Sequence, residues 1–215
     1  MIYGQDSTCS LALRDISLTI SPAEFVSIMG TSGSGKTTLL SLAAGLCHPT
    51  SGRVELLGRD LTGLREGALA RLRRRHVGFV FQTLNLMPAM TVAQNVELPL
   101  VITGQPALQR ASRVQLLLHL AGLEDKAQAY PGALSNGQQQ QVAVLRAVAH
   151  RPDIIFLDEP TSSLDSERAS VLLDLIAFLN RTESSTVILT THDPIVADRA
   201  SRRLHIRDGA LAGTF

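Results

Sequence analysis

Short apolar runs recur along this chain and are separated by longer segments of mixed character. Five of these runs predict buried strands: residues 25–29, 77–81, 154–157, 186–191 and 203–206. Four other segments predict helices: residues 39–46 and 106–120 by the spacing of their apolar side chains, residues 64–75 by propensity, and residues 166–180. Buried strands that alternate with helices indicate an α/β fold, in which helices cover both faces of a mostly parallel sheet.

Two parts of the chain break this alternation. Residues 11–20 alternate apolar and polar side chains, which predicts half-buried antiparallel strands, and residues 53–57 predict one more short strand. From residue 87 to residue 150, strand-like runs largely disappear and helical stretches replace them. We therefore expect a single domain. Its core would comprise residues 1–86, including an N-terminal antiparallel β part, and residues 151–215, with residues 87–150 as an inserted helical subdomain.

A glycine-rich loop links the first buried strand to the first helix. It comprises Gly30, Thr31, Ser32, Gly33, Ser34, Gly35, Lys36 and Thr37. Glycines at this spacing let backbone N–H groups turn toward an oxyanion, and the start of the helix adds partial positive charge. Lys36 can place its ammonium between the β- and γ-phosphates, and the Thr37 hydroxyl can coordinate Mg²⁺. The strand–loop–helix context therefore predicts a P-loop NTPase core that binds a nucleoside triphosphate.

Two adjacent carboxylates, Asp158 and Glu159, follow the apolar run at residues 154–157. Asp158 suits a Mg²⁺ shell because a hard cation prefers oxygen ligands, and Glu159 suits the activation of an attacking water. Alone, the pair could be an ordinary acidic strand end, but beside a phosphate loop it indicates hydrolysis. Gln82 and His192 also follow predicted strands, so we expect these groups to converge at one edge of the sheet.

Composition narrows the class of partner. The chain has 20 Lys and Arg against 19 Asp and Glu, and a net charge of +1 gives no reason to expect nucleic acid. Cys9 and Cys47 lack metal-type spacing, and no apolar run reaches the roughly 18 residues that a membrane span needs. We therefore expect a cytoplasmic protein that reaches the inner face of the cell membrane through a partner.

The order of the motifs resembles an ABC-transporter ATP-binding subunit. Besides the groups above, the chain has a Leu-Ser-Asn-Gly-Gln segment at residues 134–138 and Ser-Leu-Asp at residues 163–165. Stretches that resemble the branch of lipoprotein-release and macrolide-export ATPases are residues 49–52, 75–82, 95–100 and 206–209. Without the resemblance, Ser135 would be read as the N-cap of a helix that runs to about residue 149.

The resemblance implies a role for each matching residue in ATP hydrolysis. Residues 30–38, Thr38 included, would bind the triphosphate with Lys36 at its centre, and the Mg²⁺ ligands would be Thr37, Gln82 and Asp158. Gln82 would also contact the attacking water. Glu159 would be the catalytic base, and His192 would hold the γ-phosphate and orient the water.

The resemblance also implies two partners. A second copy of the chain would join head to tail, so that Ser135, Gly137, Gln138 and Asp165 reach the ATP held by the other copy. An integral membrane, permease-like subunit would be driven by this dimer. Residues 84–100 would form the docking groove for that subunit, although their apolar side chains are equally well explained by packing.

Three features depart from the family pattern. Asn136 replaces the first glycine of the signature, and we expect Asn to tolerate the left-handed backbone angles of such a loop. Gln141 stands where the family usually has Arg. Tyr3 falls where the adenine-stacking aromatic residue is found, and so becomes a candidate for that contact.

Two rival functions stay open at this point. One is a soluble ABC-type ATPase of DNA repair or translation, which usually carries two cassettes or a long coiled coil, and this chain has neither. The other is a nucleotide-dependent switch with weak hydrolysis, which Asn136 favours and the intact Glu159 and His192 oppose. The basic run at residues 71–76 fits a solvated helix face, or contact with anionic lipid or an acidic partner.

Overall fold

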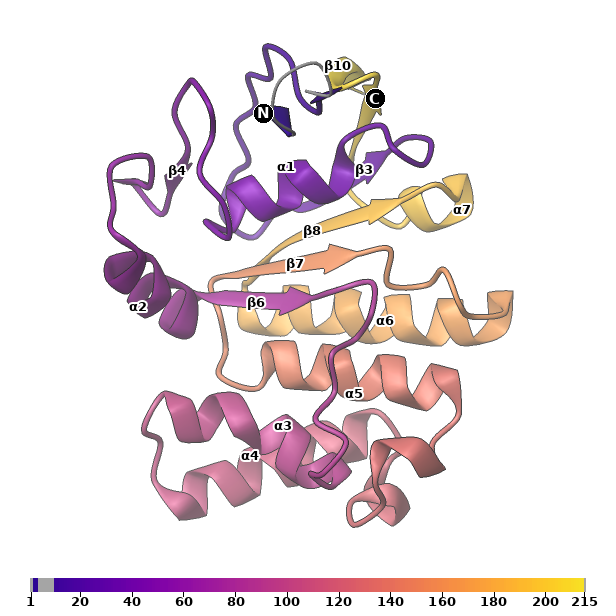
Figure 1. Ribbon diagram of the computed structural model, residues 1–215. Coiled ribbons are helices and arrows are strands. Elements are labelled where there is room, and N and C mark those ends of the chain that lie inside the picture. The colour runs from indigo at the N-terminus through magenta and orange to yellow at the C-terminus, as the bar shows by residue number, and fades with distance from the viewer. Residues whose placement is uncertain (1, 4–9, 215) are drawn as a thin grey trace.

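Six strands form the central sheet of the computed structural model, which describes residues 2–3 and 10–214 (Figure 1). Their order is β10-β9-β3-β8-β7-β6. The bounds are β3 (Phe25–Met29), β6 (Val77–Val80), β7 (Ile154–Asp158), β8 (Thr186–Thr191), β9 (Arg202–Arg207) and β10 (Ala210–Thr214). Five strands run parallel, and only β10 pairs antiparallel within this sheet, with β9. The mostly parallel sheet expected from the sequence is confirmed.

Helices cover both faces of this sheet. α1 (Lys36–Ala43) lies on one face, and α5 (Asn136–Val148) and α6 (Ser166–Glu183) lie on the other (Figure 1). Strand β7 shows how the sequence builds both layers. Phe156 packs into the α1-side core, while its neighbours Ile155 and Leu157 pack into the core on the opposite face. Successive strand residues point to opposite faces, so a strand buried on both sides must be apolar throughout.

Four more helices and two 3₁₀ turns are found in the described part of the chain. They are α2 (Glu66–His76), α3 (Val92–Ile102), α4 (Ala107–Leu120), α7 (Pro194–Ala197) and the 3₁₀ turns η2 (Glu124–Lys126) and η3 (Pro131–Ala133). α3, α4 and α5 gather at the lower end of Figure 1. Thr91 caps α3 through a reciprocal capping box with Gln94, and Gly122 follows α4 with a φ of 63°. The division into a core and a helical subdomain stays a prediction.

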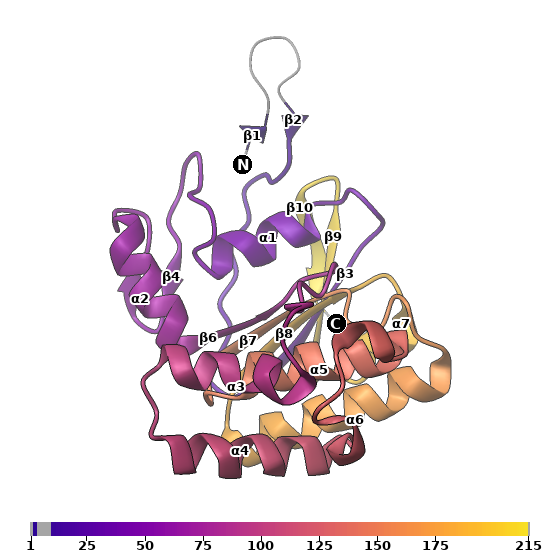
Figure 2. The ribbon, with the colours of Figure 1, turned by 60° about the horizontal axis from the view of Figure 1, so that its bottom comes forward.

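The strand expected across residues 11–20 is wrong. Only β2 (Ser10–Leu11) pairs there, with β1 (Ile2–Tyr3), and residues 12–20 form no ladder (Figure 2). Every second side chain of this stretch, Ile16, Leu18 and Ile20, nevertheless packs against the α1-side core. The alternation therefore records burial of one side of an extended chain, which does not require a strand partner.

Two smaller expectations also change. The strand expected at residues 53–57 shrinks to β4 (Glu55–Leu56), which pairs with β5 (Arg59–Asp60). β10 was missed, although Asp208 and Gly209 before it are a recognised hairpin signal and both have positive φ. Across the residues that the structure describes, none of the helices combines the length and apolarity that crossing a membrane requires.

Candidate active site

The phosphate loop, residues 30–37, lies between β3 and α1 at the carboxyl edge of the sheet. Gly35 is the N-cap of α1 with a φ of 104°, and a Cβ there would lie 2.6 Å from the Ala12 carbonyl oxygen. Gly30 is equally constrained, because its Cβ would lie 2.5 Å from the Ile206 carbonyl oxygen. α1 has no side-chain cap. The N–H groups of its first turn are therefore left for a ligand rather than for the helix.

Lys36 is buried at the centre of this loop. Its ammonium donates to the carbonyl oxygens of Gly30 at 2.7 Å and Thr31 at 3.1 Å. It also lies 3.2 Å from a carboxylate oxygen of Glu159. Only 7% of the Lys36 side chain and 12% of the Glu159 side chain are exposed, so water screens this ion pair weakly. The lysine is held in place by the loop and by the carboxylate after β7.

Asp158 joins the loop to the sheet through two hydroxyl groups. Thr37 Oγ1 donates to one carboxylate oxygen at 2.8 Å, and Thr190 Oγ1 donates to the other at 2.7 Å. The Thr190 oxygen in turn accepts the Glu159 N–H at 3.0 Å. Thr190 lies directly opposite Asp158 in the β7–β8 register. This residue was missed from the sequence, where the signal was a pair of threonines at the carboxyl end of the strand, after its apolar residues.

Glu159 adopts a left-handed backbone with a φ of 51°, which is uncommon for a side chain of this size. The turn places its carboxylate between the side chains of Lys36 and His192. One oxygen faces Lys36, and the other lies 3.0 Å from His192 Nδ1. His192 itself is 64% exposed, so the imidazole forms the outer border of the group. Lys36, Thr37, Asp158, Glu159 and His192 are thus brought together.

Other predicted residues lie around this group, and among the described residues no hydrogen bond or ion pair joins their side chains to it. Gln82 is exposed in the turn after β6, and Thr31 and Ser32 are exposed in the phosphate loop. Ser34 is buried, and its hydroxyl has no hydrogen-bond partner. Thr38 is half-buried in α1. Tyr3 belongs to β1, but its side chain falls outside what the structure describes, so adenine stacking stays a prediction.

The signature segment, residues 134–138, lies at the start of α5. Ser135 caps the helix: its hydroxyl accepts the Gln138 N–H, and the Gln138 side chain accepts the Ser135 N–H at 3.0 Å. Ser135 and Asn136 are exposed, whereas Gly137 is buried. Asn136 is the first residue of α5 and does not have positive φ. Asn136 therefore does not use the left-handed backbone angles that we expected it to tolerate, because it belongs to the helix and not to a loop before it.

Asp165 belongs to the same neighbourhood as the signature segment. It is the N-cap of α6 and accepts the Arg168 N–H at 2.9 Å. Gly137 meets the side chains of Leu164 and Arg168, so the starts of α5 and α6 lie together. None of the hydrogen bonds or ion pairs found among the described residues joins Ser135 or Asp165 to the phosphate loop. The predicted site is therefore present as two groups.

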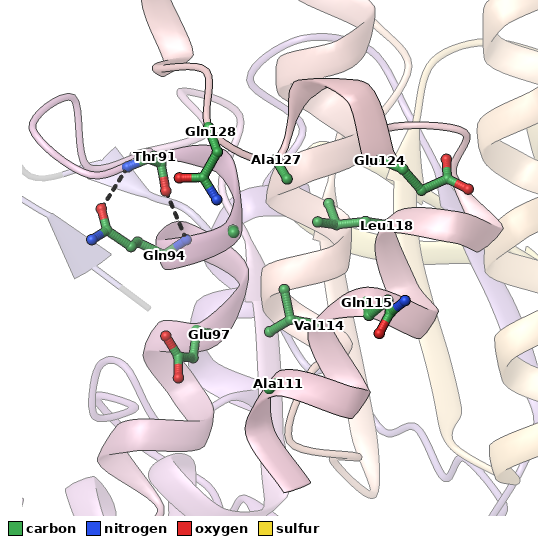
Figure 3. Close-up of a pocket in the computed structure, with 11 residues that line it drawn as sticks. Thr91, Gln94, Glu97, Ala111, Val114, Gln115, Leu118, Glu124, Ala127 and Gln128 are labelled. Carbon is green, nitrogen blue, oxygen red and sulfur yellow. Dashed lines mark hydrogen bonds between the residues drawn. The ribbon is translucent and has the colours of Figure 1, made fainter. Parts of the chain in front are cut away.

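A hollow of about 550 Å³ lies elsewhere, between α3, α4 and η2 (Figure 3). Its lining includes Gln94, Glu97, Val114, Leu118 and Gln128. Glu97 is paired with Arg110 at 2.7 Å, and Gln94 is occupied by the capping box. No residue of the phosphate loop or of the carboxylate pair reaches this hollow, so it is not where the triphosphate chemistry is located.

A phosphate loop, a buried lysine and two carboxylates at one sheet edge define a P-loop nucleoside triphosphatase. The family model of the ABC transporter matches residues 13–162, and the chain belongs to that family. It is accordingly an ABC-type ATPase. The order of its motifs and its relatives agree with the lipoprotein-release and macrolide-export branch.

Comparisons with known proteins give the same result. The chain is 44% identical over 201 residues to the lipoprotein-releasing system ATP-binding protein LolD 1 of Chlorobium chlorochromatii. The aligned region covers 93% of this chain and 82% of that protein. It is 46% identical over 199 residues to the macrolide export ATP-binding/permease protein MacB of Shigella flexneri, with 93% of this chain but only 31% of that protein covered. The chain thus spans about a third of the macrolide export proteins that it matches.

A solved structure is similar throughout. It is the dimeric post-hydrolysis state of the ATP-binding cassette MJ0796 bound to ADP and Pi, with a TM-score of 0.93 and 38% sequence identity. The similarity covers 100% of this chain and 94% of the other. The fold expected for an ABC ATPase cassette is therefore confirmed.

Proposed function

We propose that two copies of this chain close head to tail around two ATP molecules and that their opening and closing drives a membrane partner. The observation that carries this proposal is the separation of the site into two groups. Lys36, Asp158 and Glu159 form one wall, while Ser135 and the start of α5 are exposed without a contact to that wall. A second copy in the opposite orientation supplies the missing wall. The similar MJ0796 cassette is itself dimeric in its post-hydrolysis state, which supports this arrangement.

ATP binding rearranges the first wall. The Lys36 ammonium donates hydrogen bonds to loop carbonyl oxygens and pairs with Glu159. When ATP binds, the triphosphate takes the place of Glu159 beside the ammonium. The released carboxylate is then free to accept a proton from the attacking water. His192, which lies against the same carboxylate, borders the position of the γ-phosphate. Gln82 is exposed after β6, and its proposed role is to contact the water and to report the nucleotide state.

The residues of this chain fit a Mg²⁺ ion. Thr37 Oγ1 and Asp158 Oδ2 lie 2.8 Å apart, and oxygen atoms from one hydroxyl and one carboxylate are the ligands that the ion prefers. Gln82 is the third ligand that we propose. When bound, Mg²⁺ supplies positive charge that neutralises the phosphates. Thr190 keeps the remaining oxygen of Asp158 occupied, which orients the carboxylate toward Thr37.

The membrane partner is expected at a second surface. A groove of about 340 Å³ lies between α2, β6, α3 and α5, and its lining includes Phe79, Leu98, Pro99, Arg74 and Arg146. Ile102, also in this lining, is 52% exposed at the end of α3. An apolar floor with basic residues at its border suits an amphipathic segment with acidic side chains. With a membrane partner bound at this groove, we expect the protein to lie in the cytoplasm at the inner face of the cell membrane.

The branch suggests the cargo of the complete system. The named relatives act in lipoprotein release and macrolide export. We propose that this chain drives a system of the same kind, which extracts or exports an amphiphilic molecule.

Glu159→Gln tests the proposed dimer. The variant keeps a hydrogen-bonding side chain but loses the base, so it should bind ATP, hydrolyse it at least about 100-fold more slowly, and accumulate as a dimer. Light scattering with and without ATP measures the mass. A variant that stays monomeric at saturating ATP would contradict the composite pocket.

The rate of phosphate release distinguishes the proposed transport ATPase from the rival function, a nucleotide-dependent switch with weak hydrolysis. The purified chain and the chain bound to its membrane partner are compared under saturating ATP. Turnover that the partner stimulates supports a transport ATPase, whereas turnover that stays negligible in both preparations supports the switch.

A further inference from the structure

Arg168 lies against the signature segment of its own chain. The Arg168 Cδ atom would lie 3.2 Å from a Cβ at Gly137, and its Nε would lie 4.0 Å away. Leu164 forms the rest of this contact at 3.5 Å. Gly137 is buried largely because the aliphatic part of this arginine covers it. The side chain therefore fixes how the start of α5 packs against the start of α6.

The charged end of Arg168 is held in a defined direction. Its Nε lies 3.4 Å from a carboxylate oxygen of Asp165, whose other oxygen accepts the Arg168 N–H at 2.9 Å. The side chain is still 63% exposed, so the guanidinium faces solvent beside the first turn of α5. One arginine thus contacts both Asp165 and Gly137, two of the four residues that we assign to the ATP of the other copy.

The electrostatics of this corner call for an anion. α5 has no acidic residue in its first turn, so the partial positive charge of its N-terminus is not compensated within the helix. Arg168 adds a full positive charge, which the carboxylate of Asp165 balances, and Glu167 adds a second carboxylate to the first turn of α6. The positive charge that stays uncompensated in this corner is the partial charge of the α5 N-terminus. A cation beside a helix N-terminus is unfavourable for the helix alone. The arrangement becomes favourable when a phosphate from outside the chain approaches.

We propose that Arg168 is a positioning residue for ATP hydrolysis: its stem fixes the signature segment, and its guanidinium attracts the triphosphate held by the other copy. This inference rests on the proposed head-to-tail dimer, and it names a residue that strengthens closure. Ser135 and the α5 N–H groups make the contact with the phosphates, and Arg168 acts through their placement and through its charge.

The test compares Arg168→Met with Arg168→Lys. Methionine keeps the apolar cover over Gly137 but removes the charge, and lysine keeps both a stem and a charge. A partly exposed charge near a helix end contributes roughly two- to fivefold, and each dimer contains two such corners. The ATP-dependent dimer of Arg168→Met, in the Glu159→Gln background, should therefore dissociate about four- to twentyfivefold more readily. Arg168→Lys should stay within about twofold of the parent.

Turnover separates this role from a purely structural one. In the chain with Glu159 intact, Arg168→Met should lower the rate of phosphate release at subsaturating protein concentration. ATP binding to the monomer and the melting temperature should not change. Arg181→Met is the matched control, because it removes the same charge from an exposed position about 20 Å farther along α6. It should behave as the parent chain does.

Two results would overturn the inference, and they are distinguishable. If Glu159→Gln forms no dimer with ATP, the proposed function fails and takes this role with it. If Glu159→Gln dimerises and Arg168→Met dimerises equally well in that background, the dimer stands and the role of Arg168 is wrong.

Discussion

The two walls of the proposed pocket differ in how completely the chain builds them. At the sheet edge, Lys36, Asp158 and Glu159 are largely buried, and hydrogen bonds from Thr37 and Thr190 fix Asp158. At the start of α5, Ser135 and Asn136 are exposed and are ordered mainly by the capping box. Contacts within one copy hold the first wall, whereas the second wall is exposed and completes the site of the other copy in the dimer that we propose. In the proposed dimer, affinity for nucleotide therefore depends mainly on the first wall, whereas hydrolysis requires both walls.

Breaking each wall in a different copy is the strongest test of this contrast. Lys36→Met removes the ammonium from the first wall, and Ser135→Arg blocks the second with a bulky side chain. Each variant alone should hydrolyse ATP at least about 100-fold more slowly. A mixture of the two should regain turnover, because a mixed dimer contains one pocket in which both walls are intact. Phosphate release across mixing ratios measures this, and turnover equal to the sum of the separate variants would refute a shared pocket.

The ion pair between Lys36 and Glu159 predicts a change in affinity. Glu159→Gln frees the ammonium and removes a negative charge from beside the triphosphate. A partly buried pair of this kind couples by roughly 1 kcal/mol, so ADP should bind about three- to tenfold more tightly. Calorimetric titration of the monomer with ADP measures this. Glu167→Gln, at an exposed position in the first turn of α6, is the control and should leave ADP affinity unchanged. Unchanged affinity in Glu159→Gln would mean that the pair does not oppose binding.

Asn136→Gly examines the second wall alone. The side chain of Asn136 is exposed at the first position of α5, in front of the groups that would face the other copy's ATP. Its removal should raise turnover about twofold, because it clears this approach, while glycine in a helix costs less than about 1 kcal/mol at a terminal position. ATP binding to the monomer should not change. Equal turnover before and after the substitution would show that Asn136 is a neutral replacement.

The smallest expected effect concerns His150, which lies in the groove beside α2 and has neither ring nitrogen in a hydrogen bond. Burial lowers the pKa of His150, and the positive charges of Arg113 and His76 act in the same direction. The Val77 backbone lies close enough to favour the charged ring, but it makes no hydrogen bond of normal geometry with it.

In the unfolded chain, His150 takes up a proton near its ordinary pKa. In the folded protein the pKa of His150 is lower, so the ring takes up its proton only at a lower pH. The free energy of unfolding should therefore fall as pH drops from 7 toward 5.5. His150→Phe should show a smaller fall. Denaturant titrations of both proteins across this pH range measure the difference, and parallel pH profiles would contradict it.

The sequence predicted the groups whose chemistry is local. The phosphate loop and the carboxylate pair each follow an apolar strand directly, so their positions at the sheet edge followed from the strand pattern. The role of Thr190 could not be predicted, because it depends on the β7–β8 register. The ladder at residues 11–20 was wrong because alternation reports burial, and an extended segment packed on a core produces the same pattern.

The second wall was predictable only in part. From the residues alone, Ser135 was predicted only to be the N-cap of a helix, and the resemblance alone placed Ser135 and Asp165 at the boundary with the other copy. The contact of Arg168 with Gly137 could not be predicted from the sequence, because the two residues are distant along the chain. Arg113, which donates to the Val148 and Ala149 carbonyl oxygens at 3.1 Å and pairs with Glu183, was likewise not singled out.

The back of the phosphate loop has a consequence for the order of events during synthesis. Gly209, in the turn between β9 and β10, donates its N–H to the Ser34 carbonyl oxygen, and its own carbonyl accepts the Arg14 N–H. A ribosome makes residues 30–37 long before it makes this turn. A nascent chain therefore carries the complete phosphate loop before the hydrogen bonds to Gly209 can form. Nucleotide binding should begin only after the β9–β10 hairpin has emerged from the exit tunnel.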